Sequence, residues 1–203
     1  PKIIPLLSIS LFYVANPLAA AFIQNVPVFF LSSVQSGAGL VASFAINRTL
    51  IGLMRQLATQ VANATGVEVV RTLFGDDSER ATTVYDQASR VLGGIAGLTA
   101  GAILGFATPF VAIWTGREVA SDQYMLNWLA VAVFAAAPSL LPAAVLQTSN
   151  QPRLLTVGFI AQACLNSLTA ALAARLHNPR DIFIYFALWE GLTGLMILLY
   201  ARQ

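Results

Sequence analysis

Long apolar stretches separated by short polar segments dominate the pattern of this chain. Six of them approach or exceed the ~20 apolar residues that an α-helix needs to cross the hydrocarbon core of a bilayer. The pattern therefore predicts an all-α, polytopic membrane helix bundle of about six transmembrane helices. The predicted spans cover residues 3–31, 39–62, 91–114, 125–146, 154–174 and 182–201.

The first apolar stretch is too long for one straight crossing. It contains Pro5, Pro17 and Pro27, and a proline inside a helix removes a hydrogen bond and kinks the backbone. We expect a bent or broken helix whose main crossing runs over residues 11–31.

Residues 72–90 form a polar segment between the second and third spans. Asp76 followed by Glu79 resembles a capping box that opens a helix. Ala81, Val84 and Ala88 then recur at helical spacing. We expect a cytoplasmic connector made of a loop and an amphipathic helix, within a single domain over residues 1–203.

Composition strengthens the membrane prediction. Hydrophobic residues make up 57% of the chain and charged residues 10%, with a mean hydropathy of +0.72; soluble proteins rarely carry so few charges. The cations are spread along the chain, so no nucleic-acid partner is expected. Cys164 lies alone in an apolar segment. No sequence motif for a metal, a nucleotide or a catalytic nucleophile is present, so we expect no cofactor, no metal and no enzyme.

The Lys and Arg residues outside the spans predict an orientation. One side holds Lys2, Arg71, Arg80, Arg90, Arg153 and Arg202, and the other holds Arg117, Arg175 and Arg180. This excess places both chain ends in the cytoplasm. The chain begins at Pro1 without an initiating Met, so we expect it to be a piece of a longer polypeptide.

The second span carries Arg48 and Arg55 seven residues apart on one face of an apolar helix. A cation at membrane depth costs at least ~2.5–3.5 kcal/mol on insertion scales. The stripe predicts a polar cavity wall for an anionic ligand, because guanidinium pairs phosphate in a bidentate fork. Alternatively, Arg55 snorkels to the interface and Arg48 pairs with an acid or with carbonyls. The full stripe is Arg48, Gly52, Arg55, Thr59, Asn63 and Gly66.

Further polar residues in the spans are candidates for the same cavity. Gln24 and Asn25 adjoin Pro27, and kinked backbone beside polar side chains often lines transporter cavities. Hydrogen bonding between helices explains them equally well. Glu190 is the one acid well inside a span, which suggests a coupling acid, an ion-pair partner or a solvated helix end.

Glycine recurs at every fourth position of the third span, at Gly93, Gly97, Gly101 and Gly105. Such a ladder permits another helix to approach closely. We expect a tightly packed helix–helix contact here, with a sliding surface as the alternative.

Several pieces of the chain together resemble the multidrug/oligosaccharidyl-lipid/polysaccharide exporter superfamily, and its lipid-linked polysaccharide (O-antigen type) flippase branch in particular. They cover roughly half the chain and are individually weak, but their order and spacing match. The pieces are Asn47-Arg48, Leu73-Phe-Gly-Asp76, Glu79-Arg80 with Tyr85 and Arg90, Pro109-Phe-Val-Ala-Ile-Trp114-Thr-Gly116, and Leu146-Gln-Thr-Ser-Asn150-Gln-Pro-Arg153.

The resemblance implies a two-lobe transporter that moves a lipid-linked oligosaccharide across the bacterial inner membrane by alternating access. The chain would be the C-terminal six-helix lobe, and its partners would be membrane lipid, the lipid-linked substrate and an N-terminal lobe upstream. The position of Arg48 in the second helix implies contact with the substrate's pyrophosphate. The predicted substrate-binding residues are Arg48, Arg55, Asn47, Gln24 and Asn25, with Glu190 as a possible coupling acid.

Two alternatives stay open. A multidrug or cation exporter of the same fold needs an acidic site, for which Glu190 is the candidate in this chain. A non-transporting scaffold in glycan synthesis, or a membrane enzyme, is compatible with any packed helical bundle.

Overall fold

The computed structural model describes residues 3–33, 37–75, 78–116, 122–176 and 178–201. Its helices are α1 (Ile3–Ser32), α2 (Gly37–Phe74), α3 (Ser78–Trp114), α4 (Gln123–Thr148), α5 (Pro152–Leu176), the short 3-10 helix η1 (Pro179–Asp181) and α6 (Ile182–Tyr200). The described residues contain no strand, which confirms the all-α prediction.

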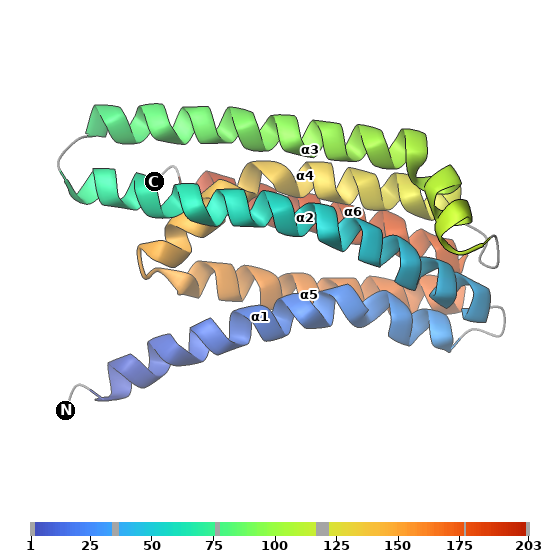
Figure 1. The fold of residues 1–203 in the computed structure, drawn as a ribbon. Coiled ribbons are helices and arrows are strands. Elements are labelled where there is room, and N and C mark those ends of the chain that lie inside the picture. The colour runs from blue at the N-terminus through green and yellow to red at the C-terminus, as the bar shows by residue number, and fades with distance from the viewer. Residues whose placement is uncertain (1–2, 34–36, 76–77, 117–121, 177, 202–203) are drawn as a thin grey trace.

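The helices run along one common axis (Figure 1). α4 lies at the centre and packs against α2, α3 and α6, whereas α1 packs mainly against α5. The N-terminal end of α1 and the C-terminal end of α6 lie at the same end of the bundle (Figure 1). This agrees with the predicted placement of both ends on one side of a membrane, although the side itself stays a prediction.

Five helical segments in the described residues are long and apolar enough to cross a membrane, which is one fewer than the six predicted. They are Ser10–Ser32, Glu79–Trp114, Gln123–Thr148, Pro152–Arg175 and Pro179–Tyr200. α2 is not among them, because Arg48, Arg55 and a run of amides and hydroxyls reduce its hydropathy. It nevertheless lies alongside the apolar α3 and α4 (Figure 1).

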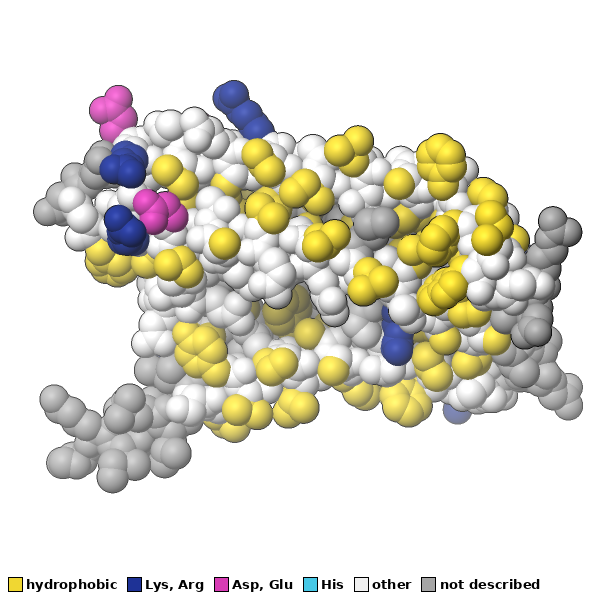
Figure 2. Space-filling model, in the orientation of Figure 1, with side chains coloured by type: hydrophobic (Ala, Val, Ile, Leu, Met, Phe, Trp, Pro, Cys, Tyr) yellow, Lys and Arg dark blue, Asp and Glu magenta, His cyan; other side chains and the backbone are white. Residues whose placement is uncertain are grey.

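Apolar side chains cover much of the face shown in Figure 2, and charged side chains gather at the end where α2 meets α3. The apolar face suits contact with lipid, and the charged end suits contact with water at the membrane surface. The largest core cluster lies toward the other end of the bundle, where the rings of Phe44 and Phe183 stack with their centroids 5.6 Å apart.

α1 is continuous across Pro17 and Pro27 and bends without breaking (Figure 1), which is one of the two forms that the sequence predicts. The predicted connector between the second and third spans needs correction. The loop expected after residue 72 is largely helical, because α2 continues to Phe74 and α3 begins at Ser78. Asp76 of the predicted capping box lies outside the described residues.

The predicted close contact at the glycine ladder is also wrong. A Cβ added at Gly93, Gly97, Gly101 or Gly105 would meet no atom within 4 Å. α3 instead packs through buried Leu92, Ala96, Ile103 and Ala107. Close approach occurs at Gly66 of α2, where a Cβ would lie 2.9 Å from the Cβ of Ala144 in α4.

Candidate functional site

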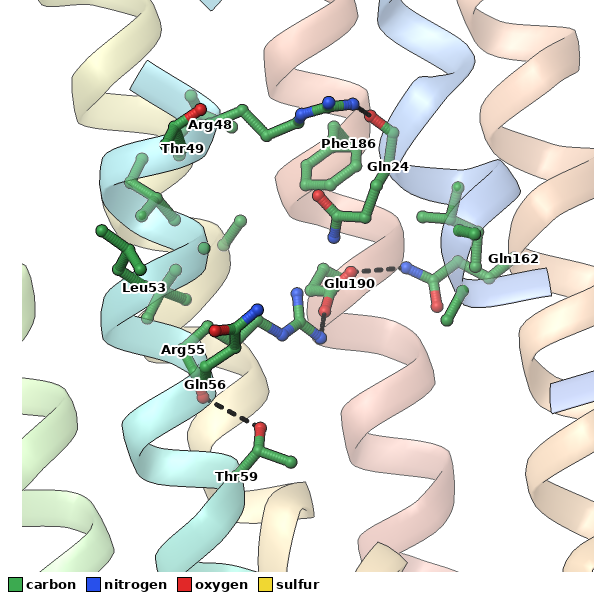
Figure 3. Close-up of a pocket in the computed structure, with 18 of the residues that line it drawn as sticks. Gln24, Arg48, Thr49, Leu53, Arg55, Gln56, Thr59, Gln162, Phe186 and Glu190 are labelled. Carbon is green, nitrogen blue, oxygen red and sulfur yellow. Dashed lines mark hydrogen bonds and ion pairs between the residues drawn. The ribbon is translucent and has the colours of Figure 1, made fainter. Parts of the chain in front are cut away.

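A cavity of about 570 Å³ opens beside the middle of α2 and is lined by residues of α1, α2, α4, α5 and α6. α1 contacts α2 much less than it contacts α5, which leaves space between the first two helices. The polar lining consists mainly of α2 side chains (Figure 3). Its polar members are Gln24, Arg48, Thr49, Arg55, Gln56, Thr59, Gln60, Gln162 and Glu190.

Arg48 reaches from α2 across the cavity to α1 (Figure 3). Its Nη1 donates to the carbonyl oxygen of Gln24 at 3.1 Å and to Oδ1 of Asn25 at 2.8 Å. A carbonyl oxygen has two lone pairs, so a carbonyl within a helix can accept a second hydrogen bond from a side chain. In the part of the chain that the structure describes, Arg48 has no carboxylate partner.

Arg55 has a carboxylate partner. Its Nη2 forms an ion pair with Oε1 of Glu190 on α6. The other carboxylate oxygen, Oε2, accepts a hydrogen bond of 2.6 Å from Nε2 of Gln162 on α5. The side chain of Glu190 is 6% exposed and that of Arg55 is 29% exposed. The carboxylate is therefore buried but satisfied on both oxygens, as buried charges require.

The charged lining residues are two guanidinium groups and one carboxylate, so the described lining carries a net charge of +1. Arg55 and Glu190 neutralise each other, and the uncompensated charge belongs to Arg48. Amides and hydroxyls supply most of the other polar groups. The cavity can therefore hold an anionic group attached to a polar, hydroxyl-bearing one.

The structure brings together four of the six predicted site residues. Arg48, Arg55, Gln24 and Glu190 line the cavity, and Asn25 adjoins it by accepting a hydrogen bond from Arg48.

Asn47 does not line the cavity, and its predicted role in substrate binding stays a prediction. It is fully buried, with its Nδ2 3.4 Å from Oγ of Ser43 and 3.5 Å from Sδ of Met125. Successive side chains on a helix differ in direction by about 100°. Asn47 therefore points into the core while Arg48 points into the cavity.

The polar stripe of α2 is only partly confirmed. Gly52 and Thr59 line the cavity with the two arginines, whereas Asn63 and Gly66 do not. Sequence reasoning missed Gln56 and Gln60, because their polarity is compatible with any exposed helix face. The hydrogen bond from Gln162 to Glu190 depends on how α5 packs against α6, which the sequence pattern does not reveal.

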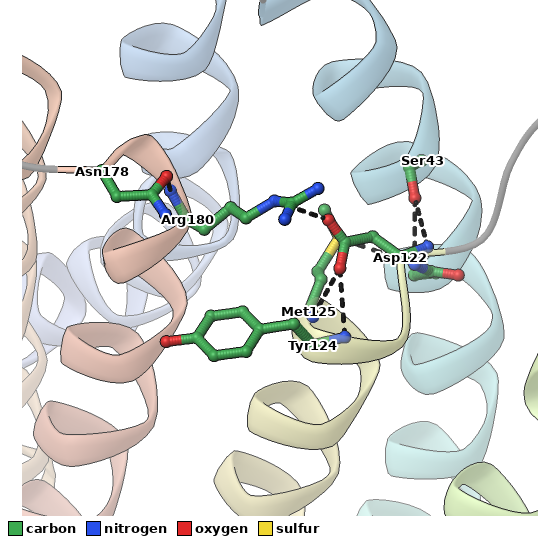
Figure 4. Close-up of polar contacts among 7 residues, drawn as sticks. Ser43, Asp122, Tyr124, Met125, Asn178 and Arg180 are labelled. Carbon is green, nitrogen blue, oxygen red and sulfur yellow. Dashed lines mark hydrogen bonds and ion pairs between the residues drawn. The ribbon is translucent and has the colours of Figure 1, made fainter.

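A second polar cluster lies where α4 begins (Figure 4). Asp122 caps α4, because its Oδ1 accepts from the backbone N–H of Tyr124 at 3.0 Å and of Met125 at 3.3 Å. Its Oδ2 lies 3.1 Å from Nε of Arg180. These contacts tie the start of α4 to the segment before α6 and account for the cluster without a ligand.

The described residues hold no group of three or more His, Cys, Asp or Glu side chains that could bind a metal ion.

The fold is similar to that of a crystallised mutant of a MATE (multidrug and toxic compound extrusion) protein. The match has a TM-score of 0.78 at 17% sequence identity and covers 95% of this chain and 43% of that chain. No family model and no curated protein matches the sequence. The fold of this chain is therefore similar to that of one part of a MATE protein, and the chain spans less than half of that protein's length.

Proposed function

We propose that this chain is one lobe of a two-lobe membrane transporter. Three observations support the proposal. The helices include five that are long and apolar enough to cross a membrane. The fold is similar to 43% of the length of a MATE protein, and a cavity with polar side chains along α2 opens between the helices.

The proposed substrate is a lipid-linked oligosaccharide precursor, flipped across the bacterial inner membrane. The single observation that carries this choice is Arg48, which lies in the cavity without a carboxylate partner in the described part of the chain. A guanidinium without a carboxylate partner suits a pyrophosphate. Amides and hydroxyls on the same wall suit sugar hydroxyls. The volume of about 570 Å³ is within the range of small-molecule sites.

Alternating access would expose this cavity to one side of the membrane and then to the other. A second lobe, supplied by a longer polypeptide, would form the opposite wall. Both ends of this chain would be cytoplasmic. The weak contact between α1 and α2 would let the cavity widen when the lobes move.

The test uses the full-length protein in liposomes with a fluorescently labelled lipid-linked oligosaccharide. Arg48→Ala should abolish translocation while the protein remains monodisperse. Arg71→Ala removes the same charge from an exposed position outside the cavity and should leave translocation unchanged. Normal translocation by Arg48→Ala would overturn the proposal.

A multidrug or cation exporter is the second candidate, because the similar structure is a MATE protein and Glu190 lies in the cavity. Glu190 is already bound to Arg55 and Gln162, so a cationic drug would have to displace an internal guanidinium. Loss of drug resistance in Glu190→Gln, with surface polysaccharide intact, would favour the exporter. Tolerance of both Arg48→Ala and Arg55→Ala would favour a scaffold.

A further inference from the structure

The two arginines of the cavity differ in what already binds them. Arg48 contacts uncharged groups, namely the acceptors on Gln24 and Asn25 and the ring of Phe44, whose centroid lies 6.0 Å from Cζ. Arg55 contacts Glu190, whose side chain is almost fully buried. The helix separates the two arginines along its axis by about 10 Å, so one compact anion cannot contact both at full strength.

We propose that Glu190 is an internal counter-anion that determines where the ligand's anionic group binds. By occupying Arg55, it leaves Arg48 as the anion-binding residue and limits the net positive charge of the cavity. This inference rests on the proposed function, since it assumes an anionic ligand.

The geometry supports a role in charge compensation. Glu190 is held on both oxygens, by Arg55 from α2 and by Gln162 from α5. The α4 residues that line the cavity next to α6, namely Leu129, Ala132 and Val133, are apolar. In the described lining, Glu190 therefore supplies the only negative charge.

Removing that charge should strengthen anion binding. A unit charge within about 10 Å at an effective dielectric constant near 20 changes the affinity for an anion by about tenfold or more. Glu190→Gln keeps the shape of the side chain and its contact with Gln162, but frees Arg55. A residue that only positioned Arg55 for the ligand would have the opposite effect, because its loss would misplace a binding group.

The experiment measures binding of farnesyl diphosphate to the full-length protein in detergent by calorimetry, with farnesol as the uncharged control ligand. Glu190→Gln should bind farnesyl diphosphate about tenfold more tightly and farnesol no differently. Arg48→Gln should lose most of the affinity. Adding Glu190→Gln to Arg48→Gln should restore binding, because the released Arg55 then serves as the anion site.

A matched control is Glu68→Gln. Glu68 also pairs with an arginine, with its Oε2 3.6 Å from Nη1 of Arg71, but it lies outside the cavity. This variant should bind the probe as the wild type does. Monodisperse elution of every variant shows that a change in affinity is not a failure to fold.

The outcomes separate this inference from the proposed function. Weaker binding by Glu190→Gln, or no rescue in the double variant, would overturn the counter-anion while Arg48 keeps its role. A wild type that does not bind the probe, together with a Glu190→Gln variant that does, would support the counter-anion and argue against diphosphate as the natural ligand. Absence of binding in both proteins would overturn both proposals, because two free guanidinium groups should hold a diphosphate.

Discussion

Arg55 on α2 and Glu190 on α6 lie 135 positions apart in the chain and form an ion pair inside the cavity. The pair joins the helix that carries the polar stripe to the last helix of the bundle. A third helix, α5, takes part through Gln162. The same contact therefore stabilises the packing of three helices and determines the charge of the cavity.

The first prediction concerns the stability that this pair supplies. Removing one partner of a buried ion pair leaves the other charge unpaired, which costs about 3 kcal/mol or more. Arg55→Met should therefore lower the thermal stability of the full-length protein in detergent. Adding Glu190→Gln should recover much of the loss, because no buried charge then remains. If the losses of stability in Arg55→Met and Glu190→Gln simply add in the double variant, the two side chains are not coupled.

The second prediction concerns the contact between α2 and α4. In Gly66→Ala, the new Cβ would lie 2.9 Å from the Cβ and 3.2 Å from the backbone carbon of Ala144. The backbone of α4 cannot move aside as a flexible side chain can, so overpacking should lower the free energy of unfolding by about 1–2 kcal/mol. Thermal unfolding measures this loss of stability.

Gly101→Ala is the matched substitution for Gly66→Ala. No atom lies within 4 Å of the added Cβ, and alanine favours a helix over glycine by about 1 kcal/mol. This variant should be as stable as the wild type or more so. Equal destabilisation at both positions would contradict the packing described for α2 and α3.

The third prediction separates the two roles of Asp122. Asp122→Ala removes the cap of α4 and the ion pair with Arg180, and should cost about 1–2 kcal/mol, most of it from the cap. Asp122→Asn keeps a capping oxygen and loses only the charge. Because the Arg180 side chain is 51% exposed, that loss should stay below about 1 kcal/mol. Thermal unfolding at low and high salt is the measurement. The unfolding temperature of the wild type should depend on salt more than that of Asp122→Asn.

The fourth prediction tests orientation. Thr83, in the first turns of α3, and Asn178, between α5 and η1, are exposed. The start of α3 and the connection from α5 to α6 lie at opposite ends of the bundle (Figure 1). In a Cys164→Ser background, a charged maleimide should label Asn178→Cys in right-side-out membrane vesicles and Thr83→Cys in inside-out vesicles. The reverse pattern would place both chain ends outside the cytoplasm.

A sequence pattern does not state which neighbours a helix face has. The glycine ladder of α3 has the spacing of a packing face, yet a Cβ added at any of its four glycines would meet no described atom within 4 Å beyond the helix's own backbone. Asn47 adjoins Arg48 in the sequence, yet it lies in the core near Met125. In each case the rotation of the helix about its axis decides which side is covered, and that rotation depends on the neighbouring helices.

The sequence by itself determined the helical class, the approximate boundaries of α1, α4, α5 and α6, the apolar exterior and the presence of two arginines on one helix face. These properties are local, because helix formation, hydropathy and side-chain periodicity depend on residues within a few turns of one another. The tertiary structure decided that Arg55 is neutralised by Glu190 and that Arg48 reaches the carbonyl of Gln24. Those contacts join residues on different helices, and the packing of the whole bundle sets the register and rotation that bring them together.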